Sequence, residues 1–260
     1  MENLNKYIPK EYLALKINYL RKLLDELPDV KLHNLKSEGP QCKRIIVGSH
    51  KYRVNTSEGQ QYYKILLTRN EAARQLSIYE AIWYSHYKDE PLPECKPHKI
   101  KRTVYAEYDK AVVMDKAFFD SLIHDDNRKY PKNPYNFFNG TYYRSAAEKE
   151  IAIFYTELGI PFKYEPSIKL VGIAKPINPD FVLYFKELDT CKFHEHFGIK
   201  ESADYMTTTK IKYGNYAAAG LIPDLDILFT YDTEDMPFDI RYLSAKLNSA
   251  VYGTAIIHKQ

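Results

Sequence analysis

Two short segments decide how this chain folds, and their acidic residues lie fifteen positions apart. The first is PDFVLYF at residues 179–185, and the second is FHEHFG at residues 193–198. The first contains the apolar run of a buried β-strand, and the second is expected to form the next strand. Side chains alternate across a strand, so Glu195 faces the same way as the two phenylalanines of its segment, and the two histidines face the other way. The sequence therefore predicts one carboxylate, Asp180, at the start of a buried strand and a second, Glu195, inside the next strand.

Around these segments, helical and extended patterns alternate. This order, α-β-β-β-α-β-α, predicts a mixed sheet with flanking helices, and so an α/β (α+β) fold. The expected elements are a helix at 145–158, strands at 162–170, 181–185 and 192–197, a helix at 203–219 closed by Gly220, a strand at 226–230 and a last helix at 239–249.

The N-terminal part predicts a smaller module made of a helix, an antiparallel β-meander and a second helix. An apolar stripe at three- and four-residue steps indicates the first helix, at 9–27, and Pro28 ends it. The expected meander strands are 44–47, 51–55 and 62–67, and a helix from Thr68 to about Tyr87 follows. We place the domain boundary in the turn-rich segment 125–141, which separates a module at 1–125 from a domain at 140–260.

Composition narrows the class of protein. The three cysteines, Cys42, Cys95 and Cys191, are far apart and odd in number, which argues against a disulfide framework or a zinc knuckle and favours a reducing cytoplasm. The N-terminus lacks the apolar core of a signal peptide, and no apolar run reaches the ~20 residues of a membrane span. We therefore expect a soluble cytoplasmic protein with no membrane partner.

Charge is unevenly distributed along the chain. Residues 1–140 carry 24 basic residues against 18 acidic ones, whereas residues 141–260 carry 13 against 16. A basic half beside an acidic one suits a nucleic-acid-binding region that is attached to a carboxylate site. The basic residues of the meander, with tyrosines between them, are the candidate nucleic-acid contacts, although an ordinary solvated strand face explains the same pattern. These residues are Lys43, Arg44, Lys51, Arg53 and Lys64.

Four residues of the second half form a set with definite chemistry. Asp180 and Glu195 from neighbouring strands, with Glu148 from the helix at 145–158, supply carboxylates for a hard divalent cation, Mg²⁺ or Mn²⁺. Lys212 lies on the later helix and supplies an ammonium that can orient water or stabilise developing charge. Such a set can hydrolyse a phosphodiester bond.

Each of these residues also has a purely structural interpretation. Proline and aspartate before a strand commonly form a turn, which would account for Asp180. The helix dipole favours Glu148 near a helix N-terminus. A lysine such as Lys169 or Lys210 could pair with a buried Glu195. The order and spacing of the residues carry the functional interpretation, more than any one of them.

That order is where a family resemblance enters. Residues 144–250 resemble a branch of the PD-(D/E)xK nuclease superfamily found in bacterial and phage-associated proteins. The resemblance implies a restriction-endonuclease-like fold, a Mg²⁺- or Mn²⁺-dependent endonuclease activity and DNA as the partner; many nucleases of this fold act as homodimers. The resembling pieces are RSAAE at 144–148, Tyr164-Glu165, Pro179-Asp180-Phe181, EHFG at 195–198, Tyr205, the helix carrying Lys212, Tyr216 and Gly220, ILFT at 227–230 and PFD at 237–239.

One position departs from the superfamily pattern. The usual lysine follows two residues after the strand glutamate, and here that position is Phe197. Relocation to the following helix is typical of the branch, so we expect Lys212 in this role, with Lys210 as the second choice. Tyr216, four residues after Lys212, and His196 are expected to support the metal ligands by hydrogen bonding.

Two further hypotheses remain open at this point. The phenylalanine at the lysine position fits a catalytically inactive nuclease fold that binds nucleic acid or regulates. The tyrosine-rich N-terminal region could be a protein-interaction module that recruits the nuclease to a complex, in place of a nucleic-acid contact. A zinc site at His194 and His196 lacks a third ligand at a fitting spacing, and no nucleotide-binding or hydrolase motif such as GxxxxGK[ST], GxSxG or HExxH occurs.

Overall fold

The computed structural model of the protein describes residues 7–34, 43–88, 90–93, 99–106, 110–198 and 203–251, with the side chains of Asn34 and residues 203–205 excepted. Cys42, Cys95 and the side chain of Tyr205 therefore lie outside the described residues. The chain divides into two compact units, one formed by residues 13–96 and the other by residues 1–12 and 97–260. Among the helices that the structure describes, none combines the length and apolar composition that a membrane span requires.

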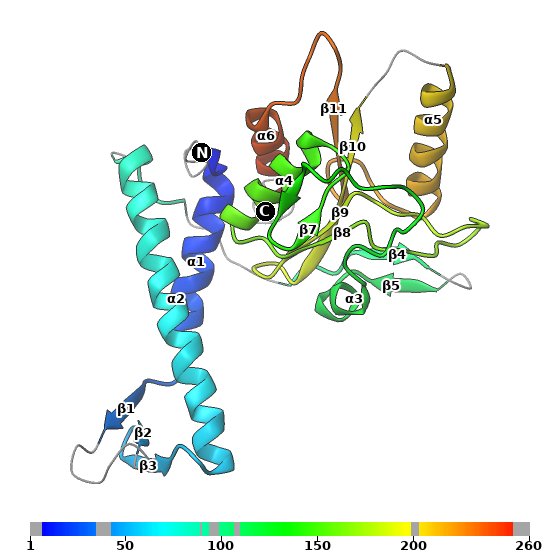
Figure 1. The fold of residues 1–260 in the computed structure, drawn as a ribbon. Coiled ribbons are helices and arrows are strands. Elements are labelled where there is room, and N and C mark those ends of the chain that lie inside the picture. Colours follow the sequence, from blue (N-terminus) through cyan, green and yellow to red (C-terminus); the bar gives the residue numbers. More distant parts are fainter. Residues whose placement is uncertain are drawn as a thin grey trace. The chain divides into compact units, whose positions relative to one another are not determined.

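The unit at 13–96 contains the expected helix–meander–helix module (Figure 1). Its sheet has the order β1-β2-β3 and is antiparallel throughout. The sheet packs on α2 through Val30, Ile45 and Leu66. The elements are α1 (Lys10–Glu26, whose first residues belong to the other unit), β1 (Val30–Asn34), β2 (Lys43–Val47), β3 (His50–Arg53) and α2 (Ser57–Tyr87).

The prediction of a third meander strand at 62–67 is wrong, because this stretch belongs to α2. The helix begins earlier than Thr68, since the side chain of Thr56 caps it by accepting the Gly59 N–H at 3.1 Å. Tyr62 and Leu66, four residues apart, then face the sheet from one side of the helix. The third strand is β1, which the sequence analysis did not anticipate.

The larger unit contains a four-stranded mixed sheet, as predicted. Its order is β11-β10-β9-β8; β10 runs parallel to β11, and the other pairs are antiparallel. The element order from α4 onward is the predicted one. The elements are α4 (Ala146–Glu157), β8 (Phe162–Tyr164), β9 (Phe181–Phe185), β10 (Thr190–Gly198), α5 (Ala203–Ala218), β11 (Ile227–Asp232) and α6 (Ile240–Val251). Strand β8 is shorter than the expected 162–170, because Glu165 has a φ of +41°, which leaves the extended region.

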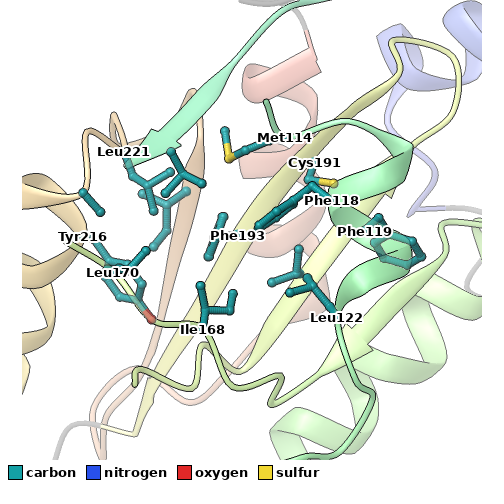
Figure 2. Close-up of a cluster of buried hydrophobic side chains, with 14 of the residues drawn as sticks. Met114, Phe118, Phe119, Leu122, Ile168, Leu170, Cys191, Phe193, Tyr216 and Leu221 are labelled. Atoms are coloured by element: carbon teal, nitrogen blue, oxygen red, sulfur yellow. The ribbon is translucent and has the colours of Figure 1, made fainter. Parts of the chain in front are cut away.

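The two faces of the sheet have different covers. Helices α4 and α6 lie on one face and α5 on the other (Figure 1). The α5 face is an apolar core built around Phe193, which α3 (Lys116–Ser121) and strand β4 (Thr103–Tyr105) complete. Figure 2 shows this core, whose labelled members are Met114, Phe118, Phe119, Leu122, Ile168, Leu170, Cys191, Phe193, Tyr216 and Leu221.

The segment between the predicted domains is an integral part of the larger unit, so the division near residue 96 lies upstream of the expected boundary at 125–141. Strands β4 and β5 (Ala111–Val113) pair with each other, and Val104 from β4 is fully buried in the core. Residues 125–141 are irregular, as expected from their turn-forming composition, but they end in a hairpin. Its strands are β6 (Phe137–Phe138) and β7 (Thr141–Tyr142).

Candidate functional site

The register of β9 and β10 sets Asp180 beside Glu195. His194 pairs with Phe181 in the antiparallel ladder, so the residues one step beyond each, Glu195 and Asp180, are neighbours at the end of the pairing. The backbone N–H of His196 donates to Asp180 Oδ2 at 2.7 Å. The Asp180 carbonyl accepts the backbone N–H of Glu165 at 3.0 Å. Asp180 is thus fixed between β10 on one side and the end of β8 on the other.

Glu195 is fully buried, and both of its carboxylate oxygens are bound from α5. The ammonium of Lys212 pairs with Oε1, and the hydroxyl of Tyr216 donates to Oε2. The four-residue spacing places both donors on the same side of α5, toward the strand. Lys210 is exposed, so Lys212 is the lysine of this helix that reaches the predicted carboxylates.

The acids of this site act on one another strongly. Burial raises the pKa of Asp180 well above its usual value, and the charges of Glu195 and Glu148 raise it further. Lys212 and the hydrogen bond from the His196 N–H oppose that shift. Burial and the Glu195 charge likewise raise the pKa of the Tyr216 hydroxyl, which keeps it protonated as a donor. The set contains more acid than base in a place with little water, so it favours the uptake of positive charge.

Glu148 sits at the N-terminus of α4, next to this pair. The hydroxyl of Ser145 caps the helix by accepting the Glu148 N–H at 3.1 Å. The Glu148 carboxylate turns back and accepts from the Tyr164 hydroxyl at 2.5 Å and from the Arg144 N–H at 3.1 Å. Glu148 therefore influences Asp180 through its charge, while its hydrogen bonds hold the start of α4.

The rings of the two histidines point to the opposite face of the sheet, as strand alternation requires. His194 shares hydrogen bonds of 2.8 Å with the hydroxyls of Tyr155 and Thr230, and His196 shares one of 2.9 Å with Thr230. Burial lowers the pKa of His196 to about 4, so its ring is neutral. His196 touches the acidic site through its backbone N–H, and its ring packs edge-on against Phe238.

No metal cluster is already assembled in the described part of the chain: no three His, Cys, Asp or Glu side chains there converge in a way that could hold a metal ion. Both Glu195 oxygens are instead held by Lys212 and Tyr216. The available donors are carboxylate oxygens, which suit hard cations such as Mg²⁺ and Mn²⁺.

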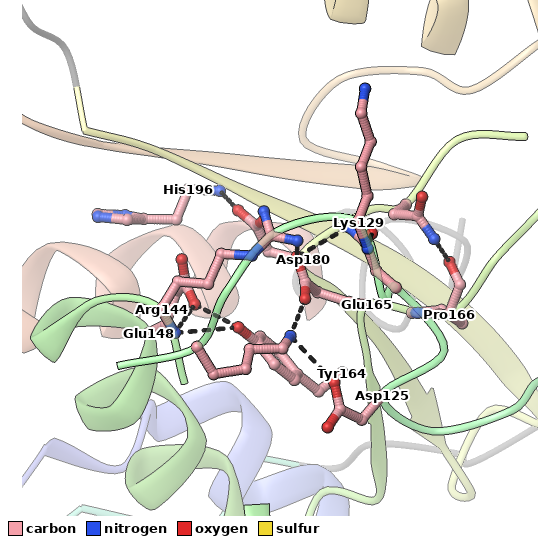
Figure 3. A network of polar contacts seen from close by, with 12 residues as sticks. Asp125, Lys129, Arg144, Glu148, Tyr164, Glu165, Pro166, Asp180 and His196 are labelled. Atoms are coloured by element: carbon pink, nitrogen blue, oxygen red, sulfur yellow. Dashed lines mark hydrogen bonds and ion pairs between the residues drawn. The ribbon is translucent and has the colours of Figure 1, made fainter. Parts of the chain in front are cut away.

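A second charged cluster adjoins the first and was missed by sequence reasoning. Glu165 is almost fully buried and pairs with both Lys132 and Arg144, and Asn127 donates to it at 3.3 Å. Burial raises the pKa of Glu165, and the two cations oppose that rise. Figure 3 shows Arg144, Glu165 and Asp180 gathered in one polar network.

The two cations of this cluster are also held by other groups. Lys132 Nζ lies 3.0 Å from Asp125 Oδ1 and 4.2 Å from the centre of the Tyr164 ring. The Arg144 guanidinium lies 4.9 Å from the centre of the Tyr130 ring. Arg144 belongs to a stretch that carried the family resemblance, so it could have been nominated. Lys132 gave no signal, because it lies in a segment read as a linker.

The basic residues of the N-terminal module divide into two groups. Arg44 pairs with Arg53 across β2 and β3, and Lys51 lies two residues before Arg53, so these three side chains share one face of the sheet. Lys43 alternates to the other face, and Lys64 lies on α2.

The same alternation adds basic groups and removes aromatic ones. His33 on β1 lies opposite Arg44, and exposed Lys31 lies opposite Ile46, on the face of Lys51. Tyr52 faces the helix and packs against Tyr62, with ring centroids 4.7 Å apart. The expected interleaving of tyrosines with the basic face is therefore not observed, because these rings form the small core between sheet and helix.

Comparisons of this chain with protein-family models, with curated proteins and with solved structures found no match.

Proposed function

We propose that the larger unit is a nuclease domain of the PD-(D/E)xK type that hydrolyses phosphodiester bonds in DNA with the aid of Mg²⁺ or Mn²⁺. One observation carries the proposal. Asp180 and Glu195 stand side by side on adjacent antiparallel strands, and the displaced Lys212 contacts the second of them from α5. Turn formation alone does not explain why Asp180 is nearly buried beside Glu195, whose like charge repels it.

Each residue has a defined part in this proposal. Asp180 and Glu195 would hold the divalent cation, and Glu148 would add negative charge from the start of α4. A bound cation supplies charge neutralisation at the phosphate and activation of water. Lys212 would donate to the attacking water or to the phosphate oxygen that gains charge. Tyr216 keeps one Glu195 oxygen oriented, and the His196 N–H does the same for Asp180.

The second candidate function is a catalytically inactive nuclease fold that binds nucleic acid or regulates. The occupation of both Glu195 oxygens by Lys212 and Tyr216 supports it, because an ammonium in the metal's place can neutralise the acid permanently. Phe197 at the usual lysine position supports it as well.

The deciding experiment combines cleavage with metal binding. Wild type and Asp180→Asn are incubated with plasmid and single-stranded DNA in Mg²⁺, Mn²⁺ or EDTA, and Mn²⁺ binding is measured by calorimetry. Asp120→Asn is the matched control, because Asp120 is an exposed acid of the same unit. We expect metal-dependent cleavage by wild type and control, and a loss of at least about a thousandfold in Asp180→Asn. Metal binding without cleavage, or neither, would favour the inactive fold.

We further propose that the exposed sheet face of the N-terminal module contacts nucleic-acid phosphates. The structure offers a control with the same change in charge. The double variant Lys51→Ala/Arg53→Ala removes charge from the face, and Lys43→Ala/Lys64→Ala removes it elsewhere on the module. We expect the first variant to weaken DNA binding and to lower the salt slope by about two units, one for each lost phosphate contact. Equal behaviour of the two variants would contradict a binding face.

A further inference from the structure

Four large aromatic side chains near the candidate site are left in solvent. Within residues 130–142, the exposed fractions are 50 % for Tyr130, 87 % for Tyr135, 52 % for Phe137 and 48 % for Tyr142. Aromatic rings of this size usually contribute their area to a core or an interface. A group of them exposed within one short segment marks a surface that binds something.

The rings of Phe137 and Tyr142 are presented by a rigid support. The β6–β7 hairpin turns through Asn139 and Gly140, with φ values of +47° and +84°, the left-handed conformations that an Asn-Gly hairpin turn adopts. Phe137 and Tyr142 are cross-strand partners on the outer face, and their ring centroids lie 4.8 Å apart. Thr141 points inward, where its hydroxyl shares a 3.0 Å hydrogen bond with His124.

The hairpin is also anchored to the body of the unit. Tyr143, directly after β7, is buried, and its ring packs on Tyr164 with a centroid distance of 4.7 Å. Its backbone bonds with Asn133 at 3.1 Å and with Asn136 at 2.9 Å close the loop before the hairpin. The rings of Phe137 and Tyr142 are therefore carried by a hairpin that is anchored at its base.

Basic charge surrounds these rings. Residues 127–149 contain five basic residues and a single acidic one, Glu148. Tyr130 lies on the Arg144 guanidinium, and Glu165 holds Arg144 beside Asp180. The Lys149 ammonium lies 3.5 Å from the Tyr135 carbonyl, so it stands at the base of the aromatic group. Tyr130 thus contacts a cation, Arg144, that belongs to the polar network containing Asp180.

We propose that Tyr130, Tyr135, Phe137 and Tyr142 form a stacking platform for unpaired nucleobases, and that single-stranded DNA is the form of substrate that enters the Asp180–Glu195 site. Ring faces in solvent can stack on bases that are not paired, and neighbouring cations contact the phosphates between them. In duplex DNA, the faces of each base are covered by the neighbouring bases, and only the base edges are accessible in the grooves. The inference deepens the proposed nuclease function and rests on it for the chemistry, but base stacking is measurable without cleavage.

The test measures binding in EDTA, where no metal-dependent turnover occurs. A fluorescein-labelled single-stranded oligodeoxynucleotide and its blunt duplex are titrated with the full chain, and anisotropy is recorded. The test variant is Phe137→Ala/Tyr142→Ala, whose side chains are half exposed. The matched control is Tyr84→Ala, an exposed aromatic on α2 with 68 % of its side chain in solvent. Circular dichroism confirms that each variant is folded.

We expect wild type to prefer the single strand, and the hairpin variant to lose roughly tenfold or more of that affinity. The control should retain it, and the weaker duplex binding should change little in both variants. Unchanged single-strand affinity in the hairpin variant would overturn the platform, as would an equal loss in the control. Concentration-dependent self-association that disappears in the hairpin variant, with unchanged DNA binding, would also overturn it by assigning the rings to a protein contact.

Cleavage assays separate this inference from the proposed function. If the wild type binds single strands through the hairpin but cuts no DNA in Mg²⁺ or Mn²⁺, the stacking platform is supported and the proposed nuclease activity is contradicted. Wild type that cuts DNA, with a hairpin variant that cuts single strands equally well, would keep the nuclease and remove the platform.

Discussion

Two buried glutamates lie on either side of Asp180 and differ in the charges around them. Glu195 and Glu165 have exposed fractions of 0 % and 1 %. Glu195 shares its surroundings with other acids, and one ammonium, that of Lys212, reaches it. Glu165 is paired with two cations, Lys132 and Arg144.

The difference teaches what each cluster is suited to bind. A buried carboxylate is costly unless its charge is balanced. Around Glu195 the acidic side chains outnumber the basic ones, which favours the binding of a divalent cation. Around Glu165 two cations, Lys132 and Arg144, are matched by two acids, Glu165 and Asp125, so the positive charges are balanced and held in fixed positions. A bound cation would therefore act at the Glu195 cluster, whereas the cations fixed around Glu165 can contact phosphate oxygens through their remaining donors.

After the substitution of Asp180 itself, the largest expected effect comes from removing the ammonium of Lys212. Lys212→Ala should lower DNA cleavage by about a hundredfold to a thousandfold, because one donor to the developing charge is lost. Lys210→Ala, two positions away on the exposed part of α5, is the matched control and should cleave normally. Single-turnover rates on plasmid DNA measure both. Equal losses, or none, would show that the contact with Glu195 is only structural.

A smaller effect is expected from changing the charged cluster around Glu165. Glu165→Gln keeps the shape but releases the charge that holds Lys132 and Arg144, so substrate should bind more weakly. We expect KM to rise roughly tenfold, with a minor change in kcat. Steady-state kinetics over a series of salt concentrations would show it. If kcat instead fell as far as in Asp180→Asn with KM unchanged, Glu165 would belong to the metal site and the contrast between the two glutamates would disappear.

The smallest effect on activity is expected for His196, whose ring lies on the opposite face of the sheet. Its substitution should change the pH dependence of stability instead. The folded protein keeps His196 neutral, with a pKa of about 4, below the ordinary value of 6.5. A lowered histidine pKa contributes stability that is present above pH 6.5 and is lost as the pH falls toward 4. In His196→Asn, the loss of unfolding free energy between pH 7 and pH 4.5 should be smaller than in wild type by up to about 3 kcal/mol. Urea unfolding at pH 7 and pH 4.5 measures it, and cleavage at pH 7.5 should stay near the wild-type rate.

Strong local patterns allowed much of the larger unit to be predicted from the sequence. The order of its elements from α4 to α6 followed from apolar runs and caps such as Ser145. Strand alternation alone separated Glu195 from the two histidines, and the structure shows that separation. Helical spacing placed Lys212 and Tyr216 on a common side, and both reach Glu195.

What failed depended on contacts between distant parts of the chain. The run at 62–67 satisfies both strand and helix patterns, and packing against the sheet decided for α2. Segment 125–141 has a linker's composition, but Lys132 from it binds Glu165, 33 residues away. Burial of Glu165 follows from the fold, and no periodicity in its neighbourhood encodes it.

Phe197 gives the displaced lysine a consequence for how such a site can change by mutation. Its ring stacks on Tyr213 of α5, with centroids 5.3 Å apart, and the Lys212 ammonium lies 5.8 Å from its centre. Phe197 of β10 is thus part of the surface on which α5, the helix bearing Lys212, rests. Exchanging Phe197 for lysine would remove that support and place two ammonium groups beside one carboxylate. Under the proposed function, the ammonium could therefore be moved from the helix to the strand only if the residues of both elements changed together.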